Sequence, residues 1–112
     1  DANQPPTKEV LEKRRQKAEA QQLMENERLC VSVLSDYARV LRSWKMQYAP
    51  QSPAEAPDER FEEACHKLDE AEYYLDILAF GDSYERAEVV NYLLVDGRLD
   101  KLKEKINGRD AA

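Results

Sequence analysis

An apolar repeat with helical spacing dominates the first half of the chain. Between residues 30 and 48 its members recur at intervals of four and three residues: Cys30, Leu34, Tyr37, Leu41, Trp44 and Tyr48. This spacing places all six on one face of an α-helix, and we refer to that face as the seam. A face of this kind has to be covered by the rest of the chain, by a second copy or by another protein.

The helix that carries the seam is predicted to be much longer than the seam itself. From Lys8 to Ala49 the chain has no Gly or Pro, which allows a helix of roughly 60 Å at 1.5 Å per residue. Residues 7–28 are polar on almost every side, so we expect a projecting helical arm with Thr7 as its N-cap. Residues 1–6 are expected to be a disordered tip. The predicted core domain spans residues 29–107, and 108–112 is a predicted loose tail.

Three further helices are predicted, at 58–80, 83–95 and 98–107. Gly81, the Asp96-Gly97 pair and Gly108 are read as their C-terminal stops. Asp82 and Glu85 have the spacing of a capping box. The apolar run at 89–95 predicts the most buried element. The predicted fold is all-α, a small three- to four-helix bundle with a long polar N-terminal helical arm.

Charge is distributed unevenly along the chain. The whole chain has a net charge of −6, but residues 51–96 contain three basic and thirteen acidic residues, a net charge of −10. This segment would repel nucleic-acid phosphates and attract a basic partner. Its simpler interpretation is a solvated acidic surface.

Cys30 and Cys65 are the two cysteines of the chain. They form a candidate disulfide, and the alternative is a pair of buried free thiols. A disulfide would agree with export, as would the start at Asp1 without a Met. We therefore slightly favour a periplasmic or secreted location over a cytoplasmic one.

Catalytic and cofactor motifs are not evident. Glu63 and His66 have the Glu-x-x-His spacing of di-iron bundles, but such a site needs a second motif and the chain has one histidine. Cys65 and His66 are adjacent, and adjacent helical side chains point about 100° apart, a poor geometry for a nucleophile and its base. The sequence predicts no enzyme, no cofactor, no metal, no small-molecule substrate and no membrane span.

Aromatic residues provide the candidate interaction surface. It comprises Tyr37, Leu41, Trp44, Tyr48, Tyr73 and Tyr84, residues of the types that anchor protein interfaces. The alternative is that they pack the bundle with hydroxyl groups in water.

Three hypotheses for function follow. The first is a non-enzymatic interaction protein (an adaptor, pilot or chaperone-like factor) that docks helix to helix on another protein or a second copy. The second is an acidic inhibitor or decoy that occupies the basic groove of a nucleic-acid-binding protein. The third is a structural homodimer in which the seam, extended to Leu23, forms a coiled coil.

Overall fold

The chain is helical along most of its length. Its structure, a computed structural model, describes residues 4–111. Over these residues it contains α1 (Lys8–Gln47), α2 (Glu59–Phe80), α3 (Ser83–Leu94), the short 3-10 helix η1 (Val95–Gly97) and α4 (Arg98–Ala111). The predicted all-α fold is confirmed, and the long first helix includes the predicted arm.

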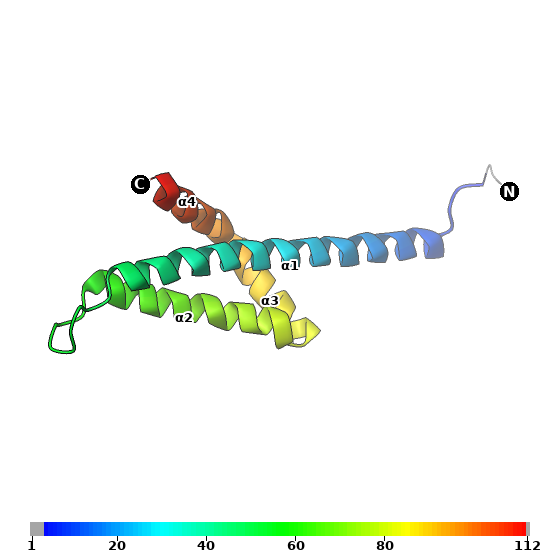
Figure 1. Cartoon of the computed structure of the whole chain (residues 1–112). Coiled ribbons are helices and arrows are strands. Elements are labelled where there is room, and N and C mark those ends of the chain that lie inside the picture. The colour runs from blue at the N-terminus through cyan, green and yellow to red at the C-terminus, as the bar shows by residue number, and fades with distance from the viewer. Residues whose placement is uncertain (1–3, 112) are drawn as a thin grey trace.

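The helices pack around the C-terminal half of α1. α2 turns back beside that half in antiparallel direction, and α3 and α4 then cross the hairpin at an angle (Figure 1). The N-terminal half of α1 extends well beyond the turn between α2 and α3. The molecule is therefore elongated, with extents of 79 × 31 × 19 Å.

The chain's own helices cover the seam. Cys30, Leu34 and Leu41 are at most 1% exposed, and Tyr37 is 8% exposed. The other helices supply the apolar residues that pack against them: Leu68, Ala71 and Leu78 from α2, Val89, Val90 and Leu93 from α3, and Leu99 and Ile106 from α4. Because this cover is intramolecular, residues 30–41 are not available to the homodimeric coiled coil considered above.

Local signals in the sequence set the starts of the helices. The Thr7 hydroxyl accepts a hydrogen bond from the Val10 amide (3.2 Å). Asp82 accepts from the Glu85 amide (2.8 Å) while the Glu85 carboxylate accepts from the Asp82 amide (3.1 Å), so the capping box is confirmed. Asp58 caps α2, and hydrogen bonds from the Arg60 side chain and amide lower the Asp58 pKa to about 2.

The cysteines do not form the candidate disulfide. Both are free thiols, Cys30 buried and Cys65 half-buried, and they are not within disulfide distance. The reason is the register of the α1–α2 hairpin, in which Arg60 lies over the Tyr48 ring (4.1 Å) and Arg42 pairs with Glu72 (3.7 Å). This register places Cys65 opposite the C-terminal end of α1, roughly 20 Å along the helix from Cys30.

Two further expectations were wrong. The apolar run 89–95 is not the most buried element, because Tyr92, Leu94 and Val95 are 39–44% exposed. Gly108 does not end the last helix, since α4 continues to Ala111, so residues 108–111 are helical rather than a loose tail. Residues 1–3 of the predicted tip, and Ala112, lie outside the described residues.

Candidate interaction surface

The structure divides the six predicted surface residues into two groups. Tyr37 and Leu41 are buried in the core, so they belong to no interaction surface of the folded chain. Trp44 and Tyr48 are half-buried and pack edge to face, with ring centroids 6.0 Å apart. The prediction of a surface position was therefore wrong for Tyr37 and Leu41 and holds only in part for Trp44 and Tyr48. A helical repeat does not reveal whether the residues that cover it come from the same chain.

Tyr73 and Tyr84 are exposed as predicted. Their exposed fractions are 62% and 70%. Tyr73 lies in α2 with its ring 5.7 Å from that of Tyr74, whereas Tyr84 lies in the first turn of α3, where a hydrogen bond with Glu88 raises its pKa. The two come from different helices.

The arm presents an entirely exposed helical surface. Every residue of α1 from Lys8 to Glu25 is exposed. Among them are the large apolar side chains of Val10, Leu11, Leu23 and Met24, with exposed fractions of 39–56%. In Figure 1 this stretch continues past the end of α2, so the bundle does not support it.

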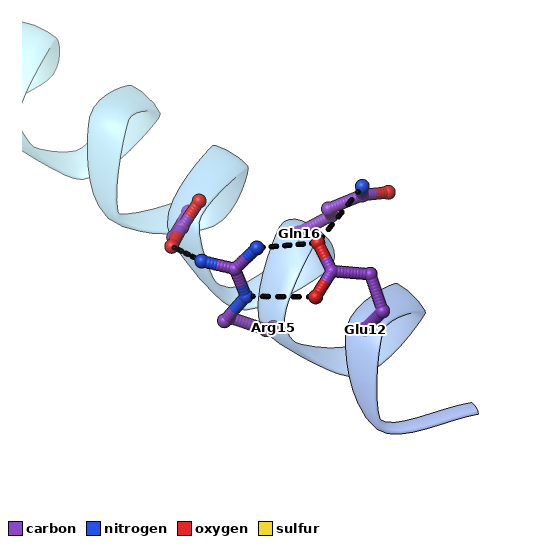
Figure 2. A network of polar contacts seen from close by, with 4 residues as sticks. Glu12, Arg15 and Gln16 are labelled. Carbon is purple, nitrogen blue, oxygen red and sulfur yellow. Dashed lines mark hydrogen bonds and ion pairs between the residues drawn. The ribbon is translucent and has the colours of Figure 1, made fainter. Parts of the chain in front are cut away.

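Polar contacts within the arm replace the missing tertiary contacts. Figure 2 shows the Arg15 guanidinium hydrogen-bonded to the Glu12 carboxylate, which also accepts from Gln16 (3.3 Å). Arg15 pairs with Glu19 on its other side (3.3 Å). Pairs three and four residues apart stabilise an exposed helix by roughly 0.2–0.5 kcal/mol each, so they support the helix of the arm while its surface stays exposed.

Exposed apolar side chains lie on the segments that meet where the arm leaves the bundle. The Glu27 carboxylate on α1 pairs with the Arg86 guanidinium on α3 (3.1 Å), and Arg86 also donates to the Gly81 carbonyl (2.8 Å). These contacts bring the α2–α3 turn to the level of Glu27. Leu23 lies one helical turn further out on the same face of α1.

Two aromatic side chains flank that turn. Phe80 is the last residue of α2 and Tyr84 begins α3, with exposed fractions of 87% and 70%, against 54% for Leu23. We call Leu23, Phe80 and Tyr84 the arm junction. Sequence reasoning gave Phe80 no surface role, although its position directly before the helix-ending Gly81 was a usable signal.

The structure also bears on metal binding and on membrane spans. Among the side chains that the structure describes, those of residues 4–108, no group of three His, Cys, Asp or Glu is placed to hold a metal ion. None of the described helices is long and apolar enough to cross a membrane. Comparisons with protein-family models, with curated proteins and with solved structures found no match.

Proposed function

We propose that this chain is a non-enzymatic interaction protein that docks a helix of another protein on its arm and arm junction. The main support is that every residue of α1 from Lys8 to Glu25 is exposed. This stretch adjoins the arm junction, in which Phe80 is 87% exposed. Single exposed apolar residues are ordinary on protein surfaces, but a cluster beside an unsupported helix is typical of an interaction surface.

The geometry of the seam supports a helix as the docking element. α2 covers the seam from Cys30 onward and ends at Phe80. Leu23 continues the same face of α1 beyond that end, since it precedes Cys30 by seven residues. A partner helix that follows α2 along α1 would cover Leu23 and contact Phe80, with the mixed charges of the arm selecting the partner.

Photo-crosslinking of the full chain tests the proposal. A benzophenone amino acid in place of Leu23 is expected to give a specific adduct in extract of the native source. The matched control places the same group at Met46, which is 80% exposed near the opposite end of α1. Phe80→Asp should abolish the adduct at position 23 without unfolding the bundle.

Light scattering after size exclusion distinguishes the partners. A concentration-dependent dimer that Phe80→Asp abolishes would identify a second copy as the partner. A monomer that gives a heterologous adduct at position 23 would identify another protein. A monomer that gives equal adducts, or none, at positions 23 and 46 would contradict the proposal.

The acidic decoy remains an alternative without a specific observation in its favour. Four carboxylates of the acidic segment are already paired inside the chain: Asp58 with Arg60 (2.8 Å), Glu63 with Lys67 (3.4 Å), Glu72 with Arg42 (3.7 Å) and Asp96 with Arg98 (3.7 Å). A decoy complex would weaken steeply as salt is raised, whereas docking at the apolar arm junction would respond little.

A further inference from the structure

A cleft lies on the bundle at the meeting point of all four α-helices. Its volume is about 250 Å³, and its lining comes from residues that are far apart in the sequence. Apolar side chains, among them Leu34 of α1, Leu93 of α3 and Leu102 of α4, contribute to its lining. No pattern in the sequence indicated a small-molecule site, because only the crossing of α3 and α4 over the α1–α2 hairpin brings these residues together.

The cleft is cationic although the chain is acidic. Lys67 of α2 and Arg98, Lys101 and Lys105 of α4 line it together with a single carboxylate, that of Glu70. Elsewhere the chain carries a large excess of acidic residues, with a net charge of −6 overall. Of these four cations, Lys67 pairs with Glu63 and Arg98 with Asp96 (3.7 Å), and Lys101 and Lys105 add further positive charge, an arrangement suited to an anion.

Two of the lysines are held close to each other. The Lys67 side chain is 31% exposed and pairs with Glu63 at 3.4 Å. Burial lowers the pKa of Lys105, and the neighbouring charge of Lys67 lowers it further. Burial also acts against the charged form of Lys67, but Tyr37, a hydrogen bond with Lys105 and the Glu63 carboxylate outweigh it and raise the Lys67 pKa. An anion between the two ammonium groups would relieve their repulsion.

An aromatic wall adjoins the lysines. The rings of Tyr74 and Tyr92 lie 5.7 Å apart at 37°, and the Arg98 guanidinium lies 4.2 Å above the Tyr92 ring. Arg98 is held there because it donates to the carbonyls of Tyr92 (3.2 Å) and Val95 (3.3 Å). Aromatic faces beside cations are the surface on which planar rings of anionic ligands stack.

The size and charge of the surroundings restrict the class of anion. At about 250 Å³ the cleft is smaller than the pockets of roughly 300–1,000 Å³ that enclose drug-sized ligands, so a ligand of nucleotide size would place its phosphate and one face of its ring there and leave the rest in solvent. A nucleic-acid strand would also have to pass the acidic residues of segment 51–96, which carries a net charge of −10. The arrangement therefore favours one small ligand with one anionic group over a polyanion.

We propose that this cleft binds a small phosphate-bearing ligand. The phosphate group lies between Lys67 and Lys105, within reach of Lys101, and the planar ring of a nucleoside monophosphate rests against Tyr74 and Tyr92. This site is separate from the arm junction, so its test is independent of the proposed docking function.

Titration calorimetry of the full chain at fixed ionic strength tests the site with three probes: AMP, inorganic phosphate and adenosine. AMP is expected to bind, and adenosine about tenfold more weakly or not at all, because the charge-assisted hydrogen bonds to the phosphate are lost. Inorganic phosphate binding as tightly as AMP would assign the site to free phosphate alone. Weaker phosphate binding would assign it to the nucleotide. Absence of binding by both AMP and phosphate at millimolar concentration would overturn the proposal.

Variants with opposite expected effects locate the phosphate. Lys105→Gln should weaken AMP binding about tenfold, whereas Lys103→Gln, on the same helix but paired with Asp100, should leave it unchanged. Glu70→Gln should tighten binding because it removes the one carboxylate of the lining. Unchanged thermal unfolding would confirm that the variants fold. Equal effects of the two lysine variants, or weaker binding by Glu70→Gln, would overturn the assignment.

Discussion

Leu41 lies in the middle of the seam and is 1% exposed. Truncation there removes apolar contacts with the helices that cover it, so Leu41→Ala should lower the free energy of unfolding by about 2–5 kcal/mol. Met46→Ala, on the same helix at an 80% exposed position, should change it by less than about 0.5 kcal/mol. Urea unfolding measures both. Equal effects of the two variants would mean that the seam is not core.

The two cysteines should differ in reactivity. Cys30 is fully buried, and burial together with the nearby Glu27 raises its pKa, so both access and thiolate formation are restricted. Cys65 is half-buried on α2. Without reductant, a thiol reagent such as DTNB should modify Cys65 in the folded chain and Cys30 only after unfolding. Two unreactive cysteines in the denatured, unreduced chain would instead indicate a disulfide.

Leu41 and the two cysteines show which features of the fold could be predicted from the sequence and which could not. The repeat identified the buried face of α1 because helical spacing is a local property. The pairing of Cys30 with Cys65 depends on the register of α1 against α2, which an eleven-residue linker (48–58) and two pairs of side chains decide. A register of that kind leaves no signal in the spacing of either helix.

At the scale of elements, replacing glycine by alanine should change the stability in opposite directions at two glycines that differ in backbone conformation. Gly97 adopts φ 67°, and a Cβ added there would have nothing within 4 Å. Gly97→Ala should therefore lower the free energy of unfolding by about 1–2 kcal/mol, through backbone strain alone. Gly108 lies inside α4, also with open space around it, so Gly108→Ala should stabilise by about 0.5–1 kcal/mol. Thermal unfolding of both variants checks the sign. Destabilisation by Gly108→Ala would contradict the helical end of α4.

The same two glycines explain why the end of α3 was predicted correctly and the end of α4 was not. Asp96 and Gly97 both have positive φ, a conformation that ends α3 and that the Asp-Gly pair favours. Gly108 was read as a similar stop, but an exposed glycine costs a helix only about 1 kcal/mol. The capping box of α3 was predictable because its two hydrogen bonds involve residues three apart.

At the scale of the whole molecule, α1 belongs to two environments. Its residues from 30 to 41 include seven buried core residues, whereas residues 8–25 are all exposed. The radius of gyration of 20.3 Å exceeds the roughly 13 Å of a compact chain of this length. The arm was predictable from its polarity, but the arm junction and the anion cleft were not, since each depends on how separate helices meet.

Hydrogen exchange should therefore follow a gradient along this single helix. Amides at 30–41 should open only with global unfolding, whereas amides at 9–22 should exchange by fraying, because few stabilising contacts hold that end. Salt near 1 M should increase exchange in the arm alone, since it screens the exposed pairs of Arg15 with Glu12 and Glu19.

Arg15→Ala should have the same effect as salt, and Lys17→Ala on the same helix should have a smaller one. Mass spectrometry of peptides from the two regions measures the difference. Equal protection of 9–22 and 30–41 would mean that the arm is covered in solution. If the two regions are equally protected at high protein concentration and the protection of 9–22 is lost on dilution, a second copy of the chain covers the arm.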